Sequence, residues 1–220
     1  MQNHLDKWSN NYLNKRYNIY PYDRVVSFIL KSYSNIDRSN IKILDVGCGG
    51  GNHLKFLADE GFDYYGIDGS EISINISKKL LDNKYKNNKL YNSNFTNMPF
   101  RNEYFDSIID RQSMGHNKIV DIEKIINEFF RILKIGGTIH SHVFGQNDPG
   151  FKYGNCVGKN DFENFSEGNF TKSHLVHAFE SNEILSLFSK FSKIDLEKEV
   201  IFNSINDEIL SEIYIINAKK

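Results

Sequence analysis

Cysteine, proline and tryptophan are scarce in this sequence, which holds two, three and one of them in 220 residues. Two cysteines are too few for a disulfide-stapled scaffold, and a chain of this length buries a sufficient core without staples. No stretch approaches the roughly 18 consecutive apolar residues of a transmembrane helix, and the polar N-terminus lacks the apolar run of a signal peptide. We therefore expect a cytoplasmic protein that makes no membrane contact.

An excess of charge of one sign is also missing, since 27 Lys and Arg residues face 28 Asp and Glu residues and the formal net charge is -1. Nucleic-acid affinity rests largely on clustered Lys and Arg side chains that neutralise phosphates, and the sequence contains no basic block. We therefore expect no nucleic-acid partner. Small-molecule chemistry becomes the leading class of function.

The order of the segments indicates one α/β domain. There is no internal repeat and no Pro/Gly/Ser-rich linker, so residues 1–220 are interpreted as a single domain. Apolar spacing predicts alternating strands and helices, which is typical of a parallel sheet. Strands are predicted at 41–46, 62–67, around 90, 105–110 and 138–144, helices at 21–34, 52–60, 119–133 and 181–191, and a closing antiparallel hairpin at 193–202 and 208–218.

Two segments are expected to flank the substrate side of the domain. Residues 1–38 are predicted to form a helical cap, and residues 145–175 a long polar loop of the length typical of a lid. Aromatic residues concentrate in both, so we expect the two to cover a pocket from opposite sides, with simple packing on the sheet edge as the alternative. They are Trp8, Tyr12, Tyr17, Tyr20 and Tyr22 in the first, and Phe151, Tyr153, Phe162, Phe165 and Phe170 in the second.

A glycine-rich turn follows the first predicted strand. Gly47, Gly49 and Gly51 stand where that strand must turn into a helix, and glycine lets backbone N–H groups approach a ligand closely. A dinucleotide fingerprint starting at Gly47 would want a further glycine where the chain has Asn52. Asp45 lies inside the strand, an unusual place for a charge unless it orients the turn or meets a cationic ligand group.

An acidic residue ends the second predicted strand. Asp68 lies 17 residues after Gly51, near the offset at which a carboxylate accepts hydrogen bonds from a ribose. The helix start behind the glycine turn suits an anionic group such as a carboxylate. Together these features predict an amino-acid nucleoside rather than a dinucleotide as ligand. The alternative is that the glycines only turn the chain and Asp68 only caps a helix.

Between Ile43 and Phe144 the sequence resembles class I S-adenosylmethionine-dependent methyltransferases, in residues 44–51, 65–70, 97–106 and 131–137. The resemblance implies a doubly wound, Rossmann-like, mostly parallel sheet of seven strands with an antiparallel last strand. It also implies S-adenosyl-L-methionine as the cofactor. The residues that it places around the cofactor are Asp45, Gly47, Cys48, Gly49, Gly51, Asp68, Gly69, Ser70, Asn94, Phe95 and Asp110.

The chain departs from the family pattern at Asn94. Many members have an aspartate there that accepts a hydrogen bond from the adenine amino group, and the carbonyl oxygen of Asn94 can accept it instead. Phe95, beside it, could stack on or flank the ring. The resemblance therefore implies an adenine site with a neutral acceptor.

Methyl transfer from a sulfonium requires an acceptor atom held in line with the methyl carbon and water kept out. A hydroxyl acceptor also needs a base, and His116, just beyond the fourth predicted strand, lies where open α/β sheets place their chemistry. We expect His116 to be a base or a substrate ligand, or else only to lead into the next helix. Arg111 could hold an anionic substrate, or form an ordinary salt bridge in the pair Asp110-Arg111.

Four further histidines form two pairs, His140 and His142 on the fifth predicted strand, and His174 and His177 beyond the long loop. No Cys-x-x-Cys or His-Glu-x-x-His motif accompanies them. We therefore expect these histidines to line the pocket and predict no metal site. Neither cysteine has local support for a nucleophilic role.

The predicted function is S-adenosylmethionine-dependent methylation of a small molecule, at oxygen or nitrogen rather than carbon. Chain size, neutral charge and the aromatic lid suggest a sugar or sugar phosphate of surface-glycan or secondary metabolism. One alternative is an NAD(P)-dependent oxidoreductase on the same fold, against which Asp45 and Asn52 count. The other is a non-catalytic S-adenosylmethionine-binding protein, because an intact cofactor site shows only that binding survives.

Overall fold

The computed structural model describes residues 18–81, 85 and 89–220. Its main element is a seven-stranded sheet in the order β3-β2-β1-β4-β5-β10-β9. Within it β10 runs in the opposite direction to the other six strands. The predicted sheet is therefore confirmed. Its strands are β1 (Lys42–Val46), β2 (Asp63–Asp68), β3 (Leu90–Asn92), β4 (Phe105–Arg111), β5 (Leu133–Phe144), β9 (Lys193–Phe202) and β10 (Ile209–Lys219).

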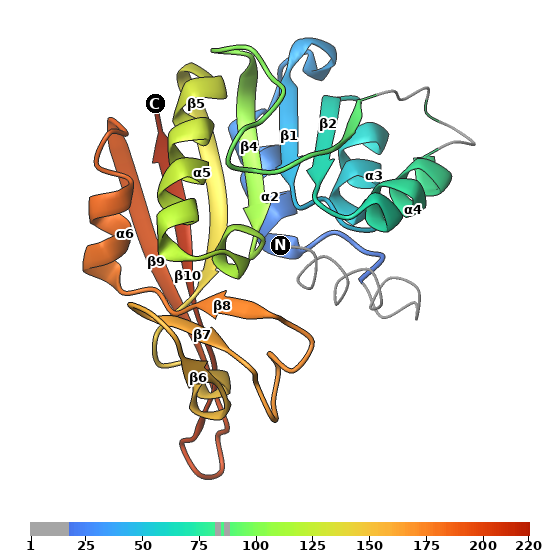
Figure 1. The fold of residues 1–220 in the computed structure, drawn as a ribbon. Coiled ribbons are helices and arrows are strands. Elements are labelled where there is room, and N and C mark those ends of the chain that lie inside the picture. The colour runs from blue at the N-terminus through green and yellow to red at the C-terminus, as the bar shows by residue number, and fades with distance from the viewer. Residues whose placement is uncertain (1–17, 82–84, 86–88) are drawn as a thin grey trace.

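Helices cover both faces of the sheet (Figure 1). On one face α2 (Asp23–Ser32), α3 (Asn52–Asp59) and α4 (Glu71–Leu81) pack over one apolar core. On the other, α5 (Ile119–Ile132) and α6 (Ser181–Leu187) pack over a second. Among the described residues, no helix has the length and apolar character to cross a bilayer.

The apolar spacing of α5 shows why this segment is helical. Its buried residues recur every three or four positions, so they form one stripe that faces the sheet. Lysine, glutamate and asparagine occupy the other face. The buried stripe consists of Ile122, Ile125, Ile126, Phe129 and Ile132.

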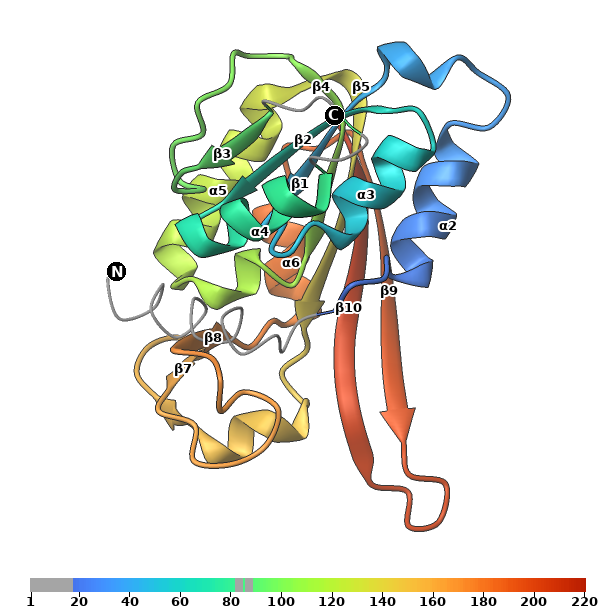
Figure 2. The same cartoon turned by 90° about the vertical axis from the view of Figure 1, so that its right-hand side faces the viewer.

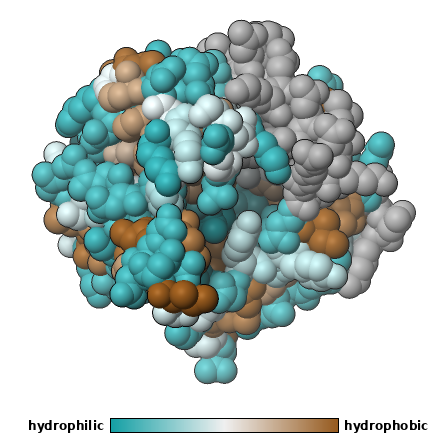
Figure 3. All heavy atoms as spheres, turned by 90° about the horizontal axis from the view of Figure 1, so that it is seen from below, coloured by the Kyte–Doolittle hydropathy of each residue, from teal (hydrophilic) through white to brown (hydrophobic). Residues whose placement is uncertain are grey.

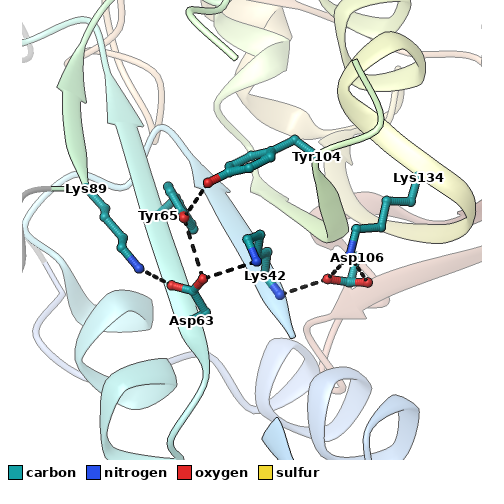
Figure 4. A network of polar contacts seen from close by, with 7 residues as sticks. All are labelled: Lys42, Asp63, Tyr65, Lys89, Tyr104, Asp106 and Lys134. Atoms are coloured by element: carbon teal, nitrogen blue, oxygen red, sulfur yellow. Dashed lines mark hydrogen bonds and ion pairs between the residues drawn. The ribbon is translucent and has the colours of Figure 1, made fainter. Parts of the chain in front are cut away.

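The amino ends of the strands carry a polar network (Figure 4). The Asp63 carboxylate contacts Lys89 and lies 3.6 Å from Lys42 Nζ, and Asp106 accepts from Lys134 Nζ at 2.7 Å. The Asp106 carboxylate also accepts from the backbone N–H of Lys42 at 2.9 Å, which ties β4 to β1. Partly exposed pairs of this kind add little stability. The network therefore connects the strands at the edge of the sheet that lies opposite their carboxyl ends. The carboxyl ends are where an open α/β sheet binds ligands.

The segment predicted as a long loop, residues 145–175, has a structure of its own. After a short 3-10 helix, η3 (Pro149–Tyr153), it forms the antiparallel sheet β6 (Asn155–Cys156), β7 (Asp161–Glu163) and β8 (Leu175–His177). The expectation of an irregular loop was wrong because strands of two or three residues are too short to show a period. Most of its aromatic residues pack on one another in a small core of Phe151, Phe162, Phe165 and Phe170.

Buried polar contacts join this small sheet to the main domain. His177 is fully buried, with Nδ1 2.7 Å from Asp161 Oδ1 and Nε2 2.9 Å from Glu183 Oε2 on α6. Asp161 Oδ1 also accepts from the backbone N–H of Ile119 at the start of α5. The sheet β6-β7-β8 is thereby fixed beside the carboxyl end of β5.

Several predicted boundaries need correction. The helix α6 ends at Leu187, four residues before the predicted end at 191, and β5 begins at Leu133 rather than 138. The closing hairpin β9–β10 is confirmed, and it extends past the other strands (Figure 2). Of the predicted cap, residues 1–17, with Trp8, Tyr12 and Tyr17, lie outside the described residues.

Candidate active site

A cavity of about 790 Å³ opens at the carboxyl ends of β1, β2 and β4. Figure 3 shows this end of the molecule, where largely hydrophilic side chains surround a hollow. Its size is within the range of small-molecule sites. The wall is built from the glycine turn, the turn after β2, residues 92–96 and the segment after β4. Residues that precede β6 and residues between β7 and β8 are also part of it.

The glycine turn forms the floor of the cavity. Gly47, Gly49 and Gly51 have φ values of +69°, +54° and +87°, in the left-handed region that side chains disfavour. A Cβ added at Gly47 would lie 1.9 Å from Ser113 Oγ. Gly47, Cys48 and Gly49 line the cavity, whereas Gly51 is the N-cap of α3 behind it. Burial raises the pKa of the Cys48 thiol, which keeps it protonated rather than nucleophilic.

Asp68 lies at the carboxyl end of β2, beside the glycine turn. Its Oδ2 accepts from the backbone N–H of Gly49 at 2.9 Å, and its Oδ1 accepts from that of Ser70 at 2.8 Å. Burial raises the pKa of Asp68 to about 6. Asp68, Gly69 and Ser70 all line the cavity, so the carboxylate that holds the glycine turn also faces the space where a ribose is expected.

The residues after β3 provide the next part of the wall, and both Asn94 and Phe95 line the cavity. The carbonyl oxygen of Asn94 accepts from the backbone N–H of Thr96 at 2.9 Å and from its hydroxyl at 3.1 Å. The oxygen expected to bind adenine is thus engaged in a local turn. Phe95 packs partly against the apolar core, which fixes it at the cavity edge.

Asp45 is buried below the glycine turn and is not among the residues that line the cavity. Its Oδ1 lies 3.4 Å from Nδ1 of His53 in the first turn of α3, and His53 does line the cavity. The charge inside β1 therefore orients a histidine. His53 was not among the predicted site residues, because a separation of eight residues between Asp45 and His53 does not indicate in the sequence that the two side chains meet.

Asp110, at the end of β4, shapes the turn that follows. Its carboxylate accepts from the backbone N–H groups of Ser113 and Met114, each at 3.0 Å, and from the hydroxyl of Ser141 at 2.6 Å. Burial raises its pKa to about 6. Asp110 is fully buried beneath the turn and does not line the cavity, so the structure places it behind the predicted site rather than in it.

His116 lies in the 3-10 helix η2 (Met114–His116), before α5, and lines the cavity. Its Nδ1 is 3.1 Å from the carbonyl oxygen of Leu175 in β8. A carbonyl only accepts, so Nδ1 carries a hydrogen, and Nε2 is the nitrogen that can accept a proton when the ring is neutral. The ring also contacts the edge of Phe144.

Arg111 is the last residue of β4, and it too lines the cavity. Its guanidinium lies over the ring of Tyr22, 4.3 Å from the centroid. Burial lowers its pKa. The alternative of a salt bridge with Asp110 is wrong, since Asp110 bonds to the turn and to Ser141.

The prediction that His140 and His142 line the pocket is wrong. They face α2, where the ring of Phe28 stacks on His140 at 4.5 Å. His140 Nδ1 lies 2.7 Å from Asn217 Oδ1, and the two Nε2 atoms are 2.9 Å apart. Burial lowers their pKa values to about 4 and about 2, so both rings are neutral core groups at pH 7.

The second pair of histidines does not line the cavity either. His177 is enclosed by carboxylates in the small sheet, and His174 is not among the lining residues. Within residues 18–81, 85 and 89–220, no group of three or more His, Cys, Asp or Glu side chains could hold a metal ion. Of the aromatic residues expected to cover the pocket, Tyr22 and Phe170 line the cavity, and Phe144 at the end of β5, which was not among them, lines it too.

The fold is shared with solved methyltransferases. A S-adenosylmethionine-dependent methyltransferase of Methanosarcina mazei aligns with a TM-score of 0.68 at 20% identity, over 91% of this chain and 98% of its own. The 1,6-didemethyltoxoflavin-N1-methyltransferase of Burkholderia thailandensis, with bound 1,6-didemethyltoxoflavin and S-adenosylhomocysteine, aligns with a TM-score of 0.67 at 14% identity, over 98% and 86%. The fold is therefore that of class I S-adenosylmethionine-dependent methyltransferases.

The sequence itself matches the methyltransferase domain family over residues 37–191, and the chain belongs to this family. Curated relatives include a ubiquinone biosynthesis O-methyltransferase of Pelagibacter ubique, 32% identical over 48% of this chain and 46% of the relative. A ubiquinone/menaquinone biosynthesis C-methyltransferase of Campylobacter jejuni is 25% identical over 58% and 52%. The chain spans between 46% and 63% of the length of the curated relatives it matches.

Proposed function

We propose that the protein transfers a methyl group from S-adenosyl-L-methionine to an oxygen or nitrogen atom of a small molecule. The observation that carries the proposal is that Asp68 and His116 line the same cavity, with the glycine turn between β1 and α3 in its wall. A carboxylate suited to bind a nucleoside and a candidate base thus share one cavity. Family membership supports the reaction class.

The residues present fit the cofactor of this class. Asp68 offers acceptor oxygens for ribose hydroxyls, Phe95 offers an aromatic edge for adenine, and the left-handed glycines leave room for close backbone approach. S-adenosylmethionine would supply, when bound, a methyl group on a positively charged sulfur. The acceptor atom bonds to the methyl carbon and the sulfur leaves with the electrons of the broken bond. The protein's own contribution is to orient the acceptor and exclude water.

His116 supplies the proton acceptor for a hydroxyl or amine. The Leu175 carbonyl holds Nδ1 in its protonated form, so Nε2 can take the proton of the acceptor as its bond to the methyl carbon forms. Phe144 and Phe170 cover the cavity beside it. Apolar rings at that position keep water from competing with the acceptor.

The polar side chains of the cavity favour a hydroxyl-rich acceptor such as a sugar or sugar phosphate. Amides and hydroxyls donate to and accept from such ligands. The curated relatives differ in acceptor atom, one being an O-methyltransferase and one a C-methyltransferase. The polar groups that support the sugar proposal are Asn18, Gln112, Asn117, Asn169, Ser173 and Ser211.

The proposal is tested first by thermal shift with S-adenosylmethionine, S-adenosylhomocysteine, NAD and NADP, because a ligand of the folded state raises its stability. Stabilisation by the two adenosyl compounds alone is expected. Stabilisation by NAD or NADP instead would favour an oxidoreductase and overturn the proposal.

An acceptor screen that measures S-adenosylhomocysteine release then tests turnover. We expect His116→Gln to lower kcat about 10²- to 10⁴-fold without weakening S-adenosylhomocysteine binding, whereas His174→Gln, outside the cavity, keeps wild-type kcat. Full turnover by His116→Gln would exclude His116 as the base. Cofactor binding with no methylated product from any acceptor class would favour a non-catalytic binding protein.

A further inference from the structure

The Arg111 guanidinium combines burial, access to the cavity and missing partners. Its Nε and Nη1 are buried and have no hydrogen-bond partner among the described residues, and no carboxylate of those residues forms an ion pair with it. Its guanidinium lies over the face of the Tyr22 ring, 4.3 Å from the centroid. Both residues line the cavity.

Asp110, Glu199 and Asp23 attract the Arg111 guanidinium electrostatically, but none of these described residues forms an ion pair with it, and two of them have other partners. Asp110 accepts three hydrogen bonds from its own turn and from Ser141. Glu199 and Glu197 on β9 both pair with Arg24, at 3.0 Å and 3.3 Å. Among the described residues, the exposed Arg24 thus forms two ion pairs, whereas Arg111, whose Nε and Nη1 are buried, forms none.

A buried guanidinium without an anion is costly, because charge is removed from water and its donors are left unsatisfied. A cation–π contact offsets only part of that cost. Arginine presents parallel N–H donors that match the two oxygens of a carboxylate or phosphate. Such a residue in a cavity wall is explained if a ligand supplies the missing anion.

We propose that Arg111, stacked on the ring of Tyr22, is an anion-binding subsite of the cavity that takes a carboxylate or phosphate group of a bound ligand. The inference rests on the proposed function, because the candidate anions belong to the cofactor and the acceptor of that reaction. Two sources share this chemistry: the amino-acid carboxylate of the cofactor, and an anionic group of the acceptor, such as the phosphate of a sugar phosphate. The subsite lies at the end of β4, one strand from the glycine turn.

The test compares wild type with Arg111→Met, which keeps much of the side-chain length and loses the charge. Calorimetric titration uses S-adenosylhomocysteine, which has the carboxylate, and 5′-methylthioadenosine, which lacks it. Arg24→Met is the matched control, because it removes an exposed arginine on α2 that is already paired. If the cofactor is the source, Arg111→Met weakens S-adenosylhomocysteine about 10- to 100-fold and leaves 5′-methylthioadenosine unchanged.

If the acceptor is the source, Arg111→Met binds both nucleosides like wild type. Inorganic phosphate or acetate then raises the melting temperature of the wild-type protein saturated with S-adenosylhomocysteine, and the variant shows no such rise. In either case the ligand-free variant melts at or above the wild-type temperature, because an unpaired buried charge is removed. Arg111→Lys keeps a charge without the fork and regains only part of the anion response.

The inference is overturned if Arg111→Met matches wild type in S-adenosylhomocysteine affinity and in its response to both anions. It is equally overturned if the variant melts below wild type while neither binding property changes, since Arg111 would then be a structural residue. Failure of the wild-type protein to bind S-adenosylhomocysteine would refute the proposed function. The phosphate and acetate titrations would still decide the subsite.

Discussion

Asp68 carries the sharpest prediction about ligand binding. Its two carboxylate oxygens accept from the N–H groups of Gly49 and Ser70, at 2.9 Å and 2.8 Å. An asparagine has a single acceptor oxygen, so Asp68→Asn turns an amide N–H₂ toward one of these donors. Hydrogen bonds to a charged group contribute about 1.5–3 kcal/mol. We therefore expect Asp68→Asn to raise the Kd for S-adenosylhomocysteine about 10- to 150-fold.

The pH dependence of binding follows from the pKa of Asp68, which burial raises to about 6. Ribose hydroxyls donate to the ionised carboxylate, so affinity is full above pH 6 and falls up to about tenfold per pH unit below it. The stability of the free protein has the opposite trend. Because the folded-state pKa lies above the ordinary value of about 3.9, Asp68 contributes stability that is present below that value and is lost as pH rises through about 6.

Calorimetric titration with S-adenosylhomocysteine between pH 5 and pH 8 measures the affinity, and unfolding of the ligand-free protein over the same pH range measures the stability. Asp63→Asn serves as control, because Asp63 lies at the amino end of the same strand, within the network of Figure 4. This control keeps wild-type affinity and its fall below pH 6. If Asp68→Asn bound within twofold of wild type, or kept the same fall in affinity, Asp68 would not be the ribose acceptor.

Two further predictions concern the glycine turn and the core. Gly47→Ala combines a left-handed φ with a Cβ 1.9 Å from Ser113 Oγ, and we expect it to lower the affinity for S-adenosylhomocysteine at least about tenfold. The control Gly61→Ala, with φ of +82° and open space around it, costs only about 1–2 kcal/mol of stability. Equal ligand affinity in the two variants would refute the steric explanation. Phe129→Ala empties a fully buried site and is expected to lower the free energy of unfolding, measured in urea, by about 3–5 kcal/mol. Val120→Ala, on the exposed side of α5, is expected to lower it by less than about 0.5 kcal/mol. Similar losses in both variants would contradict the assigned core.

The segment pattern of the sequence, together with the family resemblance, was sufficient to predict the fold and several residues that line the cavity. Strands and helices alternate with their own apolar periods, which fixes the order of a parallel sheet. The left-handed glycines after β1 and the acid that ends β2 are determined by the backbone within a few residues, so Gly47 and Asp68 could be assigned from spacing. His116 and Arg111 follow because the carboxyl ends of parallel strands meet at one edge.

Which way a side chain faces, and what it meets there, was decided only by the tertiary structure. Strand register and the crossing of α2 turn His140 away from the cavity and into the core, and the packing of α3 on β1 gives Asp45 its histidine partner, His53. The turn after β4 folds back over Asp110 and buries it. The environment of Arg111 depends on α2 and β9, which are distant in sequence. Such contacts join segments that no local period relates, so their chemistry exists only once the sheet has assembled.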